Sequence, residues 1–179
     1  MSVQVPAIHS VHVYDHDNDL ISRLSAIVST GLRLGDSVLI VATPAHRDQL
    51  VKELGLAGID VRAAVRDGRY TMLDARETLA VFMRDGSPDR ELFLANIGKE
   101  LASARLQARS RSQGLTVFGE MVAVLWEDGL KSAALELEAL WNEALSDTTF
   151  HLHCAYPRAS FIDASELRSV CETHSHVLQ

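Results

Sequence analysis

An acidic side chain stands at the point where a short apolar strand is expected to run into a helix. The stretch 115–129 contains Leu-Thr-Val-Phe, then Gly119-Glu120-Met121, then a second apolar run that ends in Trp-Glu-Asp-Gly. Ligands of open α/β sheets gather at the carboxyl ends of the strands, so Glu120 is placed to contact a ligand. An acid at the start of a helix is also favoured by the helix dipole alone. The sequence leaves both interpretations open.

Other polar or aromatic side chains follow the ends of further expected strands. Small-molecule pockets combine such groups, because a few polar contacts orient the ligand within a largely apolar wall. We therefore predict a ligand site along this edge of the sheet. Its members besides Glu120 are Tyr14, Thr43, Asp74 and Tyr156.

The turn after the first expected strand argues against nucleotide hydrolysis. A phosphate-binding loop at this place needs glycines, whose backbone N–H groups reach the phosphates, and a lysine for charge. The turn Asp15-His16-Asp17-Asn18-Asp19 has neither, and its aspartates repel a triphosphate. A kinase or an ATPase is therefore not expected.

The chain has eight histidines, which raises the alternative of a metal site. His151 and His153 share one face of an expected strand because they are two residues apart. A second group, which would meet if its strands were neighbours, is His12, His16 and His46. No group has the spacing of a recognised zinc site, and no Ser-His-Asp or Cys-His arrangement emerges.

We therefore expect no metal, no cofactor and no enzymatic activity. The alternative is a metal-dependent hydrolase that uses acids and histidines near the first strand.

Composition and charge are those of an ordinary globular domain. Of the 179 residues, 47% are hydrophobic and 23% are charged, which suits one domain with a single core. The net charge of −7 argues against nucleic acid as a direct partner, because such a partner requires a basic surface.

The cysteines and the lengths of the apolar runs indicate the cellular compartment of the protein. Cys154 and Cys171 lie far apart and form no CxxC pair, so we expect free thiols in a reducing compartment. The N-terminus has no signal-peptide pattern, and no apolar run approaches the length of a membrane span. We expect a soluble, cytoplasmic protein without membrane contact.

Expected strands alternate with expected helices. Apolar runs predict strands at 9–14, 37–42, 59–64, 70–73, 115–118 and 150–156. Apolar stripes, caps and glycine stops predict helices at 20–32, 44–54, 74–83, 87–113, 121–128, 130–145 and 163–174. Capping boxes that begin at Asp74 and Asp163 mark the starts of two of these helices. This order predicts an α/β fold, with a mainly parallel sheet and helices on both faces, in one domain 1–179 after a loose tail at 1–7. Trp126 and Trp141 are expected to anchor the core, and His174 is expected in an exposed or capping role near the C-terminus.

Several motifs, in order along nearly the whole chain, resemble one family. The most specific is Gly119-Glu120-Met121, and Cys154-Ala-Tyr156 is another. The others are His9 before a strand that ends in Tyr14, Gly31-Leu32, Gly35-Asp36, Gly68, Phe82 with Gly86, Leu-Glu-Ala-Leu-Trp-Asn at 137–142, Phe161 and His174. Together they resemble the MEDS domain, the sensory domain named for methanogen and methylotroph proteins and the dichloromethane repressor.

The resemblance implies a RecA/KaiC-like α/β core that has lost its P-loop, with small hydrocarbon derivatives as ligands. It also implies fusion to, or partnership with, a histidine kinase or a helix-turn-helix regulator. The positions that it marks are His9, Tyr14, Glu120, Cys154, Tyr156 and His174. No output module is present in the 179 residues, so we expect a free-standing sensor that acts through a partner or one domain of a longer protein.

The function expected from the sequence is therefore sensing without catalysis. A small molecule would bind at the carboxyl ends of the strands, and the change would pass to a partner or a fused output module. One alternative is an interaction module without a ligand, in which the acidic surface and the 130–145 helix contact a partner or a second copy. The other is the metal-dependent hydrolase.

Overall fold

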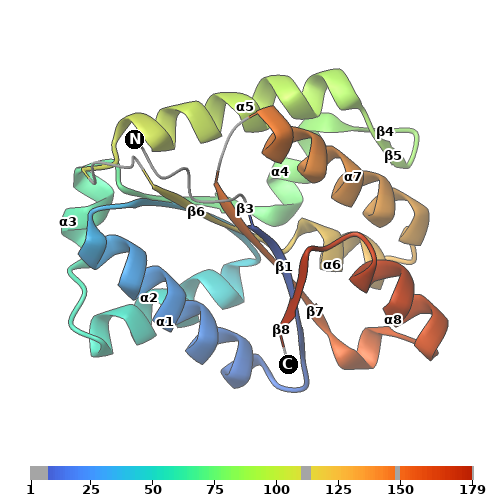
Figure 1. The fold of residues 1–179 in the computed structure, drawn as a ribbon, viewed down its shortest axis with the longest axis horizontal. Helices are drawn as coiled ribbons and strands as arrows, with labels where there is room; N and C mark the ends of the chain where they lie inside the picture. The colour runs from blue at the N-terminus through green and yellow to red at the C-terminus, as the bar shows by residue number, and fades with distance from the viewer. Residues whose placement is uncertain (1–7, 110–113, 148–149, 179) are drawn as a thin grey trace.

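A parallel sheet runs through the middle of the protein (Figure 1). The computed structural model describes residues 8–109, 114–147 and 150–178, so the expected tail at 1–7 lies outside the described residues. The six strands of the sheet, in spatial order, are β3 (Tyr70–Asp74), β2 (Ser37–Ala42), β6 (Leu115–Gly119), β7 (His151–Pro157), β1 (Ile8–Tyr14) and β8 (His176–Leu178). Every neighbouring pair is parallel. The predicted α/β class is confirmed.

Helices cover both faces of the sheet, as predicted, and each face has its own apolar core. The face with α1 also carries α2 and α3; their bounds are Asp17–Leu34, Pro44–Leu56 and Val61–Arg66. The opposite face carries α4 (Ala75–Phe82), α5 (Arg90–Leu106), α6 (Met121–Glu127), α7 (Lys131–Asp147) and α8 (Ala164–Cys171). A short hairpin of β4 (Met83–Arg84) and β5 (Ser87–Pro88) joins α4 to α5, and the 3-10 turn η1 (Arg158–Ser160) follows β7.

The alternation of side chains along β1 and β7 decides which predicted site residues can meet. Successive side chains of a strand point to opposite faces. Val11 and Cys154 are register partners and both belong to the core under α7. Tyr14 and Ala155 belong instead to the core under α1. Residues of one predicted site can therefore lie on opposite sides of the sheet.

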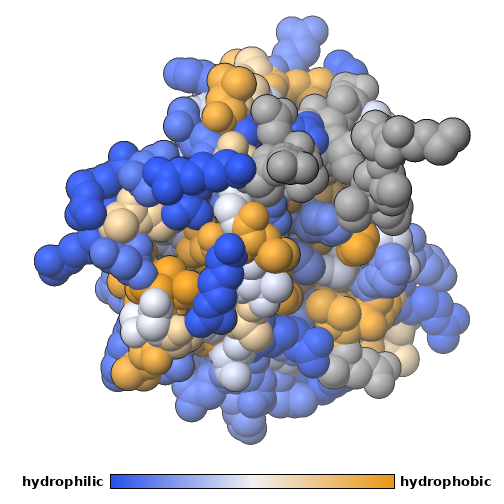
Figure 2. All heavy atoms as spheres, turned by 60° about the vertical axis from the view of Figure 1, so that its left-hand side comes forward, coloured by the Kyte–Doolittle hydropathy of each residue, from blue (hydrophilic) through white to orange (hydrophobic). Residues whose placement is uncertain are grey.

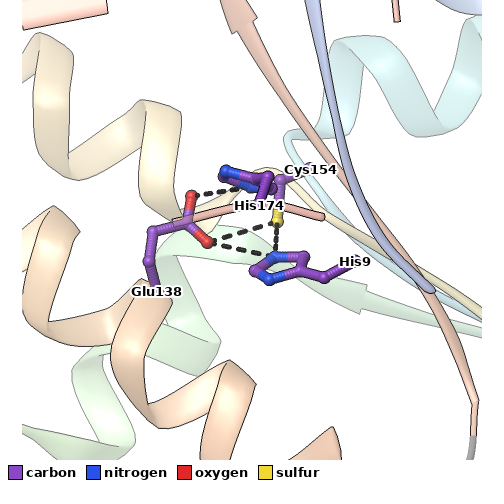
Figure 3. A group of neighbouring side chains, drawn as sticks. All are labelled: His9, Glu138, Cys154 and His174. Atoms are coloured by element: carbon purple, nitrogen blue, oxygen red, sulfur yellow. Dashed lines mark hydrogen bonds and ion pairs between the residues drawn. The ribbon is translucent and has the colours of Figure 1, made fainter. Parts of the chain in front are cut away.

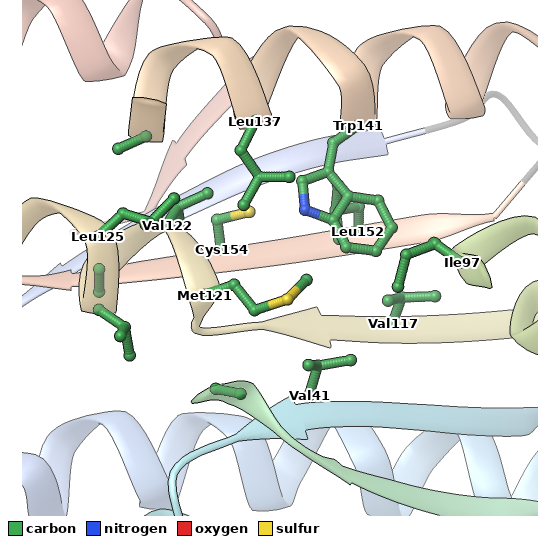
Figure 4. Packing of buried hydrophobic residues seen from close by; sticks show 14 of the residues in the cluster. Val41, Ile97, Val117, Met121, Val122, Leu125, Leu137, Trp141, Leu152 and Cys154 are labelled. Carbon is green, nitrogen blue, oxygen red and sulfur yellow. The ribbon is translucent and has the colours of Figure 1, made fainter. Parts of the chain in front are cut away.

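Aromatic and branched side chains fill the core between α5, α7 and the sheet (Figure 4). Trp141 and Leu137 project from α7 onto the strand residues Leu152 and Val117. Trp126 and Trp141 are 3% and 0% exposed, so their predicted place in the core is confirmed.

Three local predictions are wrong. Residues 59–64 are not a strand, because Asp60 accepts a hydrogen bond from the N–H of Ala63 and caps α3 instead. The first helix does not close near Gly31; it runs to Leu34, and Gly35 takes the left-handed conformation at its end (φ 88°).

The third wrong prediction concerns the last helix. It ends at Cys171 instead of continuing to 174, and the chain then turns to form β8 on the edge of the sheet. The β4–β5 hairpin was also not predicted; it turns at Asp85 and Gly86, both with positive φ. Two-residue strands and a three-residue edge strand are too short to show a periodicity of their own.

Among the helices of the described residues, none combines the length and the apolar character needed to cross a bilayer.

Truncating Phe93 tests this account of the core. The ring is 0% exposed and meets those of Phe82 and Trp141 edge-on, with centroids 5.3 and 5.2 Å away. We expect Phe93→Ala to lower the free energy of unfolding by about 3–5 kcal/mol, because it leaves a cavity. The matched control, Leu106→Ala, changes a residue of the same helix that is 77% exposed, and should change stability by less than about 0.5 kcal/mol. Equal effects in urea unfolding would contradict the assignment.

Candidate functional site

The sheet separates the predicted site residues into two groups. Tyr14, Thr43, Asp74 and Glu120 lie at the carboxyl ends of β1, β2, β3 and β6. The remaining four, His9, Cys154, Tyr156 and His174, meet on the α7 face of the sheet. The strand-end group is described first.

Glu120 links the end of β6 to the start of α2. It follows Gly119 and is 5% exposed, and one carboxylate oxygen, Oε2, accepts a hydrogen bond from the N–H of Thr43 at 2.7 Å. The other, Oε1, lies 2.5 Å from Nδ1 of His46. Thr43 is the N-cap residue of α2 but its own side chain makes no capping bond. The carboxylate of Glu120 therefore caps the N-terminus of α2, although Glu120 itself precedes α6.

The contact with Glu120 also sets the charge of His46. The hydrogen bond to the carboxylate raises the pKa of His46, against the opposing effect of burial, and Asp17 adds to the rise at 3.5 Å. The contact over the strand ends therefore favours the protonated form of His46.

A cavity of about 570 Å³ opens beside Tyr14 at the end of β1. Its lining residues are His12, Val13, Tyr14, Asp15, Asp19, Ser22, Arg23, Ala26 and Arg158. Burial, followed by the charges of Glu120 and two further acids, raises the pKa of Tyr14, so its hydroxyl stays protonated. Nδ1 of His12 is buried without a hydrogen-bond partner among the described residues. Burial lowers the pKa of His12, and the ring is therefore neutral at pH 7.

Asp74 is a member of the strand-end group that does not line the cavity beside Tyr14. Its carboxylate accepts hydrogen bonds from the N–H groups of Arg76 and Glu77 and so caps α4, as its predicted capping box indicates. It also pairs with Arg47 at 3.0 Å. Asp74 lies on β3, the edge strand at the opposite end of the sheet from β8. It lines a separate cavity of about 210 Å³ between α4 and α5.

The second group is a buried cluster of four side chains that point toward one another (Figure 3). Nε2 of His9 lies 3.4 Å from Sγ of Cys154 and 3.2 Å from Oε2 of Glu138. Sγ of Cys154 lies 3.7 Å from the same oxygen, and Nε2 of His174 lies 3.4 Å from the other oxygen, Oε1. The side chains of His9, Glu138 and His174 are at most 3% exposed, and Cys154 is 1% exposed.

Each member of the cluster comes from a different segment. His9 is near the start of β1, Glu138 is on α7, Cys154 is on β7, and His174 follows α8. The N–H and hydroxyl of Ser175 both donate to the carbonyl of His9 at 2.8 Å. This contact holds the segment that carries His174 against β1.

Surrounding groups fix the orientation of the cluster. Nδ1 of His9 faces Oδ1 of Asn142 at 2.8 Å, and the amide nitrogen of Asn142 donates to the carbonyl of Thr173. Nδ1 of His174 faces the carbonyl of Val170 at 2.8 Å. The hydroxyl of Tyr156 donates to Oε1 of Glu138 at 2.7 Å.

Burial and charge act on the same cluster. Burial opposes the ionised form of Glu138, but the hydrogen bond from His9 and the charge of His174 outweigh it and lower the pKa of the carboxyl group. Burial, reinforced by the Glu138 charge, raises the pKa of Cys154. Burial also lowers the pKa of His174. A carboxylate thus lies among a thiol and imidazoles inside the protein.

Comparison with known proteins decides the family. The family model for the methanogen/methylotroph, DcmR sensory domain, abbreviated MEDS, matches residues 8–175. The chain belongs to the MEDS family. Comparisons with curated proteins and with solved structures found no match.

Glu138 is the member of the MEDS domain's cluster that the sequence prediction missed. It lies four residues after Ala134 and three before Trp141, both 0% exposed, so it shares their buried face of α7. An acid inside an apolar helical stripe was the available signal, because a buried charge requires partners. The exposed role expected for His174 is wrong, since its side chain is 0% exposed. The capping alternative is confirmed, because Nδ1 of His174 contacts the carbonyl of Val170 in the last turn of α8.

The histidine groups considered from the sequence do not form clusters in this MEDS domain. β1 and β2 are not neighbours, and His46 meets Glu120 and Asp17 instead of joining His12 and His16. His153 lies 2.6 Å from the hydroxyl of Ser10, and burial lowers its pKa to about 4.

The ion pair of Glu120 with His46 predicts a pH dependence. The folded-state pKa of His46 is raised above 6.5, so its contribution to stability is complete below that pH and is lost as the pH rises through the folded-state value. His46→Gln should cost about 1.5–3 kcal/mol at the acidic end of this range, the usual contribution of a hydrogen bond to a charged group.

The measurement is urea unfolding of both proteins from about pH 5.5 to about pH 9, with the difference between them expected to shrink as the pH rises. His16→Gln is the control, because His16 is exposed and its side chain caps nothing. A difference that is constant over the whole pH range would contradict the charged pair.

Proposed function

We propose that this MEDS domain is a cytoplasmic, non-catalytic sensor that binds a small molecule in the cavity beside Tyr14 and signals through a partner protein or a fused output module. The family is a sensory one. The observation that carries the finer proposal is the cavity at the carboxyl end of β1, which Tyr14 and His12 line.

The cavity has the size and the chemistry that a small ligand needs. Its volume of about 570 Å³ falls within the range of roughly 300–1,000 Å³ found for small-molecule sites. Tyr14 offers an aromatic ring and a protonated hydroxyl, and His12 adds a neutral imidazole ring to the lining. A ligand with one or two polar atoms on a short hydrocarbon skeleton matches these groups. Asp15 and Arg158 pair with each other at 3.0 Å in the lining.

The start of α1 supports recognition over phosphate chemistry. A helix N-terminus at a strand end normally attracts phosphate, but the first turn of α1 contains Asp17 and Asp19. These carboxylates occupy the positive end of the helix dipole and repel an anion. The same feature supports descent from a RecA/KaiC-like fold that has lost its P-loop, and it argues against turnover of a nucleotide. Two free cysteines, Cys154 and Cys171, are consistent with a reducing cytoplasm.

Helix α1 is the proposed route for the signal. It contributes Asp19, Ser22, Arg23 and Ala26 to the cavity and packs against α2. A ligand that orders these side chains changes the surface that α1 and α2 present to a partner such as a histidine kinase or a transcription regulator. On the face shown in Figure 2, hydrophobic side chains form several separate patches among hydrophilic ones. Small patches suit a reversible contact better than a permanent one.

Thermal-shift screening against small alcohols, amines, acids and halogenated hydrocarbons tests the proposal. We expect at least one class to raise the melting temperature of the protein, and Tyr14→Phe and His12→Phe each to reduce that shift by removing a polar contact. The control is Glu100→Ala, which alters the separate cavity between α4 and α5. If the shift is the same in all the variants, the ligand does not bind beside Tyr14.

A further inference from the structure

We propose that His9, Glu138, Cys154 and His174 form a binding site for a divalent transition metal, zinc by the chemistry of the ligands. The residues lie under α7, on the face of the sheet opposite to α1, and none of them lines the cavity beside Tyr14. The inference is therefore independent of the proposed ligand site, and either can fail without the other.

The spacing of the four ligand atoms fits one small cation. One atom from each residue can be chosen so that all four lie within 4.8 Å of one another. Bond lengths of about 2.0–2.3 Å in a tetrahedral zinc site place neighbouring ligand atoms roughly 3.3–3.6 Å apart. The separations of 3.2, 3.4 and 3.7 Å among His9 Nε2, Cys154 Sγ and Glu138 Oε2 bracket this range.

The hydrogen bonds around the cluster leave both histidines with a lone pair directed inward. Nδ1 of His9 faces an amide oxygen and Nδ1 of His174 faces a carbonyl oxygen, so both Nδ1 atoms must be donors. The identity of the amide oxygen follows from the nitrogen of Asn142, which donates to Thr173. In the neutral rings, Nε2 is then the acceptor, and both Nε2 atoms point at the Glu138 carboxylate.

Acceptors that face one another require a shared positive charge, supplied by a metal ion or, without a metal, by a proton such as that of the hydrogen bond from His9 to Glu138. Hydrogen bonds from the second ring nitrogen to a carbonyl or amide oxygen are also the usual outer contacts of metal-bound histidines. Tyr156 adds a further contact of this kind, because its hydroxyl donates a hydrogen bond to Oε1 of Glu138. The other oxygen, Oε2, then faces His9 and Cys154.

The donor set selects the metal class. One sulfur, two imidazole nitrogens and one carboxylate oxygen suit zinc, whereas calcium and magnesium prefer oxygen ligands alone. Four protein ligands in a buried position leave no open coordination site, which is typical of a structural zinc centre. On binding, the metal takes the place of the thiol proton of Cys154 and of any proton that His9 or His174 shares with Glu138, and these protons are released to solvent.

A metal here would fasten segments that are distant in the chain. His9 and His174 lie near the two ends of the described chain, and Glu138 and Cys154 belong to α7 and β7. Cross-links that close long loops restrict the unfolded chain most. Zinc would thus hold α7 and the segment after α8 against β1 and β7.

The proposal is tested by measuring the zinc content of the purified protein and the absorption spectrum of its cobalt form. Variants of the two cysteines, Cys154→Ser and Cys171→Ser, are compared as a matched pair. Wild type and Cys171→Ser should each hold about one zinc ion per chain after dialysis, because Cys171 lies outside the cluster. Cys154→Ser should lose affinity by more than the roughly 10- to 100-fold that follows removal of an outer contact. Cobalt bound to wild type should show a sulfur-to-cobalt charge-transfer band and the visible bands of four-coordinate cobalt.

The cobalt spectrum of wild type decides the question even where Cys154→Ser fails to fold. The proposal is overturned by folded wild type that binds no zinc, by a cobalt complex without the sulfur band, or by an equal loss of zinc in Cys171→Ser. Each of these results would contradict a zinc site at these four residues.

Discussion

A fully buried carboxylate, that of Glu138, sets the requirements for the side chains around it. An ionised acid removed from water is stable only when partners replace its hydration. Here the partners are Tyr156, Cys154 and two histidines, and they come from both ends of the chain. Glu138 therefore gains all its partners only when α7 packs on the sheet, β1 takes its place beside β7 and the chain turns after α8. One charge thus links four segments that the sequence keeps far apart.

The parallel sheet makes this arrangement possible and keeps it separate from the strand ends. In β1, His9 and Tyr14 are five residues apart, an odd number, and alternation directs them to opposite faces. His9 joins Glu138 under α7, whereas Tyr14 faces α1 and the cavity at the strand end. The same two strands, β1 and β7, therefore support a closed polar cluster on one face and an open cavity at the end of the other.

Much of the fold followed from the sequence, because its signals are local. The apolar run of β2 predicted a strand buried on both faces, and the capping aspartates Asp74 and Asp163 predicted the starts of α4 and α8. The prediction failed where a local signal was weak or ambiguous. Residues 59–64 contain β-branched side chains that suggest a strand, but the cap from Asp60 favours a helix.

The candidate site was harder to predict, because its grouping depends on strand order. The eight predicted site residues could be named from strand ends and from the family resemblance, yet the sequence could not show that β6 and β7 separate β2 from β1. That order brings Glu120 to Thr43 and sends Cys154 to Glu138. Glu138 lay within one of the family motifs, and only its place on the apolar stripe of α7 marked it as an acid that requires partners. The most direct test asks whether a zinc ion balances the negative charge of the Glu138 carboxylate. It is anomalous diffraction on both sides of the zinc absorption edge, from crystals grown with zinc. The account predicts one strong peak between Oε2 of Glu138, Sγ of Cys154 and Nε2 of the two histidines; an empty cluster, with zinc only on the molecular surface, would contradict it.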